Sequence, residues 1–141
     1  MSILQSDIPG AKVLDLFAGS GALGLEALSR GADSATLVEK NAKSLRTIQG
    51  NIEALEAGDA ANVKRADAIE FAKTLAAGDF DVAFADPPYE GGFAPLLASI
   101  WLQTPFASIL SIEHKRGEDM PGAADTRRYG DSAITFYRSE E

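Results

Sequence analysis

The sequence contains no cysteine and only one histidine among its 141 residues. The lack of thiols excludes disulfides, thiolate catalysis and zinc sites built on cysteine, and one imidazole offers little to any other metal. We therefore expect no metal site. The chemistry of this protein must use carboxylates, backbone groups, aromatic rings or a cofactor.

Long apolar runs are also lacking. There is no run of about 18 or more apolar residues, and residues 1–10 lack the basic start and apolar stretch of a signal peptide. We therefore expect a cytoplasmic protein without a membrane association. Because 45% of the residues are hydrophobic and 24% are charged, residues 1–141 fit a single domain with a buried core.

Positive charge is in deficit, with 13 lysines and arginines against 21 acidic residues and a formal net charge of -8. This balance counts against nucleic-acid binding, because phosphate contacts normally require a basic face. Basic pairs at Lys64-Arg65, Lys115-Arg116 and Arg127-Arg128 offset the deficit locally. Such pairs are usually solvated loop ends, so they receive little weight.

Short apolar runs alternate with longer amphipathic stretches, which is typical of strand-helix units around a parallel sheet. A hairpin with a turn at Gly130-Asp131 is expected at the end. These patterns predict an α/β fold with a Rossmann-like, mostly parallel seven-stranded sheet and an antiparallel C-terminal hairpin strand, as in methyltransferases that use S-adenosylmethionine (SAM). Strands are expected at 12–17, 34–39, 62–64, 80–85, 109–113, 127–129 and 133–137, and helices at about 22–30, 41–57, 68–77 and 93–102.

A glycine-rich turn separates the first expected strand from the first helix. Gly19, Gly21 and Gly24 satisfy the dinucleotide pattern G-x-G-x-x-G, and Glu39 lies 20 residues after Gly19, near the expected position of a ribose-binding acid. Glycine at such a turn lets the backbone approach a ligand closely. The glycines alone fit a nicotinamide cofactor as well as SAM, and a tight turn without a ligand is the structural alternative.

Asp15 favours SAM over a dinucleotide. A carboxylate at the end of the first strand would crowd a pyrophosphate but attract the ammonium of the SAM methionyl group. Glu39 would accept hydrogen bonds from the ribose hydroxyls. We place Phe17 and Lys40 in the same predicted cofactor site, together with Gly19 and Gly21.

Asp67 follows the third expected strand. Its carboxylate could accept a hydrogen bond from the exocyclic amine of the cofactor's adenine, with the Ala68 backbone amide nearby. An aspartate before a helix is also a common N-cap, and this alternative remains open.

The tetrapeptide Asp86-Pro87-Pro88-Tyr89 follows the fourth, strongly apolar strand, at the edge of an open α/β sheet where ligands bind. An aromatic amine is a poor nucleophile because its lone pair is delocalised. Acceptors on its hydrogens can aim the lone pair and stabilise the developing charge. Asp86 and the Pro87 carbonyl would be these acceptors, and Tyr89 would stack on the extruded base. We also place Asp86 among the residues that bind the cofactor.

Three further residues receive ordinary structural interpretations. We read His114 as a loop residue after the fifth strand. Trp101 and Phe106 are expected in the core rather than in a base-stacking platform.

Residues 15–32, with the sequence DLFAGSGALGLEALSRGA, closely resemble the bacterial RsmD family. The resemblance continues through 38–41, 67–68, 86–89 and 128–131, and so covers nearly the whole chain. It implies SAM-dependent methylation of the exocyclic amine of a guanine in small-subunit (16S) ribosomal RNA. It also implies the RNA or the 30S particle as partner and a monomeric enzyme.

Family members usually carry a further basic, helical segment before the first strand, and we expect it to be absent here. This segment would cover the cofactor and grip RNA. The rival interpretations are a DNA amine methyltransferase, which shares the tetrapeptide, and a non-catalytic SAM-binding or RNA-binding module. A nicotinamide dehydrogenase comes last.

Overall fold

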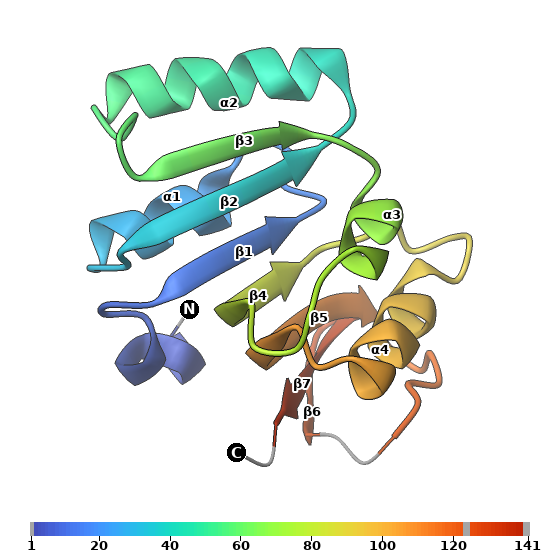
Figure 1. Ribbon diagram of the computed structural model, residues 1–141. Coiled ribbons are helices and arrows are strands. Elements are labelled where there is room, and N and C mark those ends of the chain that lie inside the picture. Colours follow the sequence, from blue (N-terminus) through green and yellow to red (C-terminus); the bar gives the residue numbers. More distant parts are fainter. Residues whose placement is uncertain (1, 123–124, 140–141) are drawn as a thin grey trace.

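The computed structural model describes residues 2–122 and 125–139, and within these ranges the chain forms a seven-stranded sheet (Figure 1). The strand order is β3-β2-β1-β4-β5-β7-β6. β1 to β5 run parallel, and β7 is antiparallel to both of its neighbours, which confirms the predicted sheet. The strands are β1 (Lys12–Leu16), β2 (Ser34–Glu39), β3 (Ala61–Arg65), β4 (Phe80–Ala85), β5 (Ala107–Lys115), β6 (Asp125–Tyr129) and β7 (Ser132–Arg138).

The helices cover both faces of the sheet. α1 and α2 lie on one face, and α3 and α4 lie on the other (Figure 1). The chain builds outward from β1 to β3 and then returns to β4 on the opposite side of β1, so right-handed crossovers place the two helix pairs on opposite faces. The helices are α1 (Ala22–Ser29), α2 (Ala42–Ala54), α3 (Ala68–Lys73) and α4 (Phe93–Gln103), with a 3-10 helix η1 (Ser2–Asp7) at the start.

The end of α2 shows how local backbone chemistry sets a boundary. The helix stops at Ala54, short of the expected residue 57, because Glu56 adopts a left-handed φ of 53°. The Glu56 amide donates to the Glu53 carbonyl at 3.2 Å, and the Ala57 amide donates to the Ile52 carbonyl at 3.0 Å. These two bonds form a Schellman motif, which satisfies the last carbonyls of the helix. α3 also ends earlier than expected, at Lys73.

The core contains the expected aromatic residues. Trp101 is 5% exposed and Phe106 is fully buried, which confirms both as core residues. The Trp101 indole donates to the Ala107 carbonyl at 2.8 Å, and its ring packs against Tyr137. In the described part of the chain, no helix combines the length and apolar character needed to cross a membrane.

His114 is not a loop residue, so that prediction is wrong. It lies in β5 opposite Ala133 of β7 and is 2% exposed. Its Nδ1 lies 3.0 Å from the Lys115 carbonyl, and its Nε2 lies 2.6 Å from the Thr135 hydroxyl. The polar sequence around His114 has little strand signal of its own, and pairing with β7 extends the strand through it.

Candidate cofactor and acceptor site

The carboxyl ends of the central parallel strands meet where the strand order reverses between β1 and β4, which is the usual ligand edge of such sheets. A cavity of about 510 Å³ lies at this edge. Its size is within the range of small-molecule sites. We call it the larger cavity, to distinguish it from a smaller one described below. It is lined by Phe17, Val38, Glu39, Lys40, Ala66, Asp67, Ala68, Asp86, Pro87, Pro88, Tyr89, Phe93 and Glu113.

Most of the predicted site residues meet in the larger cavity, but Asp15, Gly19 and Gly21 do not line it. Gly19 lines a separate pocket together with Ser20 and residues of α2. Gly21 is the N-cap of α1 and has a left-handed φ of 81°. The predicted ligand contacts of these three residues remain predictions.

Asp15 is 2% exposed and lies beneath the glycine loop. Its Oδ2 accepts a hydrogen bond from the Gly24 amide at 3.0 Å. A Cβ on Gly24 would lie 2.3 Å from Leu37 Cδ2 and 3.2 Å from Asp15 Oδ2, so only glycine fits there without displacing its neighbours. Asp15 and Gly24 together hold the start of α1 against β1.

The pKa of Asp15 is raised to about 7, chiefly by burial; the Gly24 hydrogen bond opposes this rise, and the nearby carboxylates of Asp86 and Glu39 add to it. Because the pKa of Asp15 is higher in the folded protein than in the unfolded chain, protonated Asp15 contributes its full stabilisation below the ordinary pKa of 3.8. This contribution to the free energy of unfolding is lost as the pH rises from 3.8 through about 7. The charge of Asp15 therefore costs stability in the free protein at neutral and alkaline pH.

An Asp15→Asn variant should test this cost, because it removes the charge and keeps an acceptor for the Gly24 amide. Relative to the variant, the wild-type free energy of unfolding should fall by roughly 2–3 kcal/mol between about pH 5 and pH 8. Urea denaturation at each pH measures the difference. Asp33→Asn, at an exposed position, controls for the loss of one negative charge. If the free energy of unfolding changed with pH by the same amount in wild type and Asp15→Asn, the prediction would be contradicted.

Glu39 joins the glycine loop to the start of α2. Its Oε1 accepts from the Gly19 amide at 2.8 Å, and its Oε2 accepts from the amides of Lys40 at 3.0 Å and Asn41 at 2.9 Å. Carboxylates accept such bonds strongly. Glu39 also lines the larger cavity, so one side chain shapes the glycine loop and presents acceptor oxygens to the cavity.

Asp67 is the N-cap of α3, which confirms the structural alternative for this residue. Its Oδ1 accepts from the Glu70 amide at 3.0 Å, and its Oδ2 lies 3.5 Å from Lys40 Nζ. The Glu70 bond and then Lys40 hold the pKa of Asp67 below its ordinary value. Capping does not use up the acceptor capacity of the carboxylate, and the predicted contact with a cofactor remains a prediction.

Phe17 and Phe93 supply an aromatic wall of the larger cavity, with ring centroids 6.0 Å apart. Phe17 has a left-handed φ of 58°, which is costly for a residue with an aromatic side chain. Backbone strain of this kind concentrates at ligand sites. Sequence reasoning missed Phe93, because it lies at the start of α4 with no motif around it.

The Asp86-Pro87-Pro88-Tyr89 turn leaves the end of β4 along the larger cavity. Partial desolvation raises the pKa of Asp86 above its ordinary value. The Tyr89 hydroxyl hydrogen bonds to the Ser132 hydroxyl at the start of β7, while the side chain stays 40% exposed. The tyrosine ring is thus held at its polar end and offers the rest of its surface to a planar ligand.

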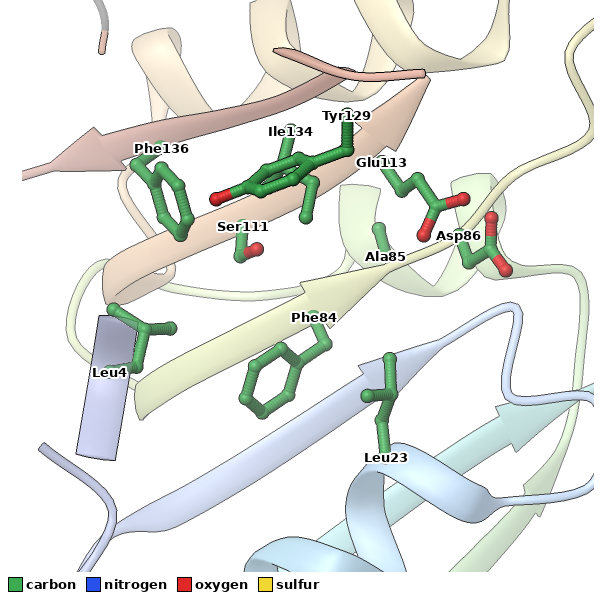
Figure 2. A pocket seen from close by; sticks show the side chains of 10 residues that line it. All are labelled: Leu4, Leu23, Phe84, Ala85, Asp86, Ser111, Glu113, Tyr129, Ile134 and Phe136. Carbon is green, nitrogen blue, oxygen red and sulfur yellow. The ribbon is translucent and has the colours of Figure 1, made fainter. Parts of the chain in front are cut away.

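A second, smaller cavity of about 280 Å³ lies on the α1 face of the sheet (Figure 2). Its walls are mostly apolar and come from several elements, including Leu23 of α1, Phe84 of β4 and Ile134 of β7. Asp86 and Glu113 line this smaller cavity as well as the larger one. Sequence reasoning missed Glu113, although it is the last residue of the strand expected at 109–113.

Residues 1–138 match the model of a protein family described as conserved hypothetical protein 95, which is the RsmD family. The chain belongs to this family. The resemblance found in the sequence is therefore confirmed across nearly the whole chain.

Two curated relatives illustrate the match. "Putative rRNA methyltransferase YlbH" of Bacillus subtilis is 34% identical over 140 residues, covering 92% of this chain and 76% of the relative. "Ribosomal RNA small subunit methyltransferase D" of Escherichia coli K12 is 42% identical over 85 residues, covering 60% of this chain and 42% of the relative. The latter match spans less than half of the length of that enzyme.

Solved structures agree with the family assignment. "Putative methyltransferase yhhF" from Escherichia coli superposes with a TM-score of 0.84 at 30% identity, covering 99% of this chain and 81% of that one. An RNA methyltransferase from Salinibacter ruber, solved with S-adenosyl-L-homocysteine, has a TM-score of 0.75 at 14% identity, covering 99% and 90% of the two chains. At that low identity the likeness shows the fold alone. The Rossmann-like methyltransferase fold predicted from the sequence is confirmed.

Proposed function

We propose that this protein transfers a methyl group from SAM to the exocyclic N2 amine of a guanine in small-subunit ribosomal RNA. The observation that carries this proposal is the position of Asp86-Pro87-Pro88-Tyr89, which lines the same cavity as Glu39 and Asp67. The names of the relatives support ribosomal RNA as the substrate. The cofactor, the acceptor amine and the residue roles are proposed together as one reaction.

The residues of the larger cavity fit SAM. Carboxylate oxygens of Glu39 and Asp67 are available as acceptors, and Phe17 and Phe93 offer an apolar wall. Glu39 accepts from the ribose hydroxyls, and Asp67 accepts from the adenine amine beside the Ala68 amide. When bound, SAM supplies an electrophilic methyl group on a cationic sulfonium, which the carboxylates of this cavity favour electrostatically.

Asp86 and Pro87 act on the acceptor amine. The Asp86 carboxylate and the Pro87 carbonyl accept hydrogen bonds from the two amine hydrogens, so that the nitrogen lone pair points at the methyl group. As the new N–C bond forms, the bond from the methyl group to the sulfonium sulfur of SAM would break, and Asp86 would stabilise the positive charge that develops on the nitrogen. The raised pKa of Asp86 also lets this carboxylate take the proton that the methylated amine releases.

Tyr89 holds the target base. An amine that is buried in a stacked helix must leave its stack before it can reach a cofactor cavity. The exposed ring of Tyr89 provides a stacking surface for the extruded base, and the hydrogen bond to Ser132 fixes the orientation of the ring. We expect the protein to act as a monomer in the cytoplasm, on the 30S particle or its RNA.

Two titrations and a transfer assay test this proposal. Calorimetry should show binding of SAM and no binding of NADH; the reverse result would overturn the cofactor assignment. Labelled methyl groups from SAM should then appear on small subunits that lack the modification and not on large subunits or duplex DNA. Transfer to DNA alone would favour the DNA amine methyltransferase, and SAM binding without any transfer would favour the non-catalytic module.

A further inference from the structure

The end of β5 places a second carboxylate beside Asp86. β4 and β5 pair in parallel with Phe84 opposite Ser111 and Ala85 opposite Ile112, so Asp86 and Glu113 come next on adjacent strands. Figure 2 shows the two carboxylates at the same end of the smaller cavity. Burial raises the pKa of Glu113, and the neighbouring Asp86 raises it further while a hydrogen bond from Tyr89 lowers it. Glu113 therefore faces both Asp86 and Tyr89, the two side chains placed in the transfer step.

Glu113 and Asp86 lie between the two cavities. Both residues line the larger cavity, which is the proposed SAM site, and both also line the smaller cavity. A base whose amine lies on Asp86 has a ring atom on each side of that amine, and Glu113 lies on one side of Asp86. In the orientation that points N1 toward Glu113, its partly buried carboxylate meets the edge of the base.

The edges of the purines differ at that neighbouring ring atom. Guanine carries a hydrogen on N1 next to its N2 amine, so it presents a donor there that a carboxylate can accept. Adenine and 2-aminopurine carry a bare lone pair on N1 next to their amine, and this lone pair repels a carboxylate. Discrimination of this kind works by leaving the wrong base with an unpaired, repulsive contact.

We propose that Glu113 selects guanine as the acceptor base, by accepting a hydrogen bond from N1–H while Asp86 and the Pro87 carbonyl hold the two N2 hydrogens. This inference rests on the proposed function and adds a specificity-determining residue to it. Glu113 needs no chemical change during the transfer. It acts by orienting the base and rejecting edges that lack the N1 hydrogen.

A Glu113→Gln variant provides a test, because its amide keeps the shape of the side chain and exchanges one acceptor for a donor. The introduced amide matches 2-aminopurine, whose N1 accepts and whose N2 amine donates. The acceptor position is first mapped with wild-type protein, and small subunits are then reconstituted with guanine or 2-aminopurine at that position. The preference for guanine is the ratio of kcat/KM for subunits with guanine to kcat/KM for subunits with 2-aminopurine. We expect this ratio to be about 10–100-fold lower for Glu113→Gln than for the wild type.

Glu90→Gln is the matched control, at an exposed position just after the tetrapeptide, and its preference should equal that of the wild type. SAM affinity and the thermal midpoint of Glu113→Gln should stay close to the wild-type values. An unchanged preference, or a loss of activity that follows a loss of SAM binding, would overturn the role of Glu113. Absence of transfer by the wild type would instead overturn the proposed function, so the two failures are distinguishable.

Discussion

Replacing Asp86 with alanine is expected to lower kcat for methyl transfer by about 10²–10³-fold, with little change in the affinity for SAM. The carboxylate aims the amine lone pair and stabilises the charge that develops on the nitrogen, and both effects belong to the transition state. The larger cavity keeps its other walls in the variant, so the cofactor should still bind. Single-turnover transfer at saturating SAM measures the chemical step, and calorimetry measures the cofactor affinity.

Two companion variants sharpen this test. Asp86→Asn keeps an acceptor oxygen and loses the charge, so it should retain more activity than Asp86→Ala. Asp59→Ala removes an exposed aspartate in the turn before β3 and should leave kcat unchanged. An Asp86→Ala variant with wild-type kcat, or one whose loss of activity follows weakened SAM binding, would show that Asp86 does not act on the acceptor.

The second large effect is expected for Glu39→Ala, which should weaken SAM binding by about 100-fold. Three backbone amides, those of Gly19, Lys40 and Asn41, lose their shared acceptor in this variant. Hydrogen bonds to a charged group contribute about 1.5–3 kcal/mol each, so the loss of one or two bonds to the ribose corresponds to the expected change in affinity, while the lost amide bonds lower the stability. Calorimetric titration with SAM measures the effect, and thermal unfolding should show a lower midpoint.

Glu26→Ala serves as the control, because Glu26 is exposed and its carboxylate forms an ion pair with Arg30, the C-cap of α1, at 3.2 Å. Exposed pairs of this kind contribute little to stability. Glu39→Gln should lie between wild type and Glu39→Ala, since its amide keeps one acceptor oxygen. Equal SAM affinities for wild type and Glu39→Ala would mean that neither the glycine loop nor the ribose depends on this carboxylate.

The architecture was predictable from the sequence because the central parallel strands are buried on both faces. Val82, Ala83, Phe84 and Ala85 of β4 are all buried, and such continuous apolar runs are easy to recognise. The right-handed crossover rule then leaves few topologies. His114 was missed because its strand position depends on pairing with β7, which lies in a later segment of the chain and leaves no local signal.

The candidate site was predictable where a motif lies at the end of a strand, as for Glu39 and Asp86. The spacing of the motif residues along the sequence does not show which of them line the cavity and which lie beneath the residues that line it. Asp15 is buried under the loop because its carboxylate pairs with Gly24, which is a tertiary contact. Glu113 lacks a motif, and its importance arises from the β4–β5 register that places it beside Asp86.

Identification of the modified nucleoside tests the central claim most directly. Small subunits lacking the modification would be incubated with the protein and SAM, and their RNA digested to nucleosides and analysed by mass spectrometry against standards. N2-methylguanosine is expected at one position of the small-subunit RNA, formed by the wild type and strongly reduced with Asp86→Ala after the same incubation time. Methylated adenine, a methyl group on a ring atom of guanine, or no methylated nucleoside would contradict it.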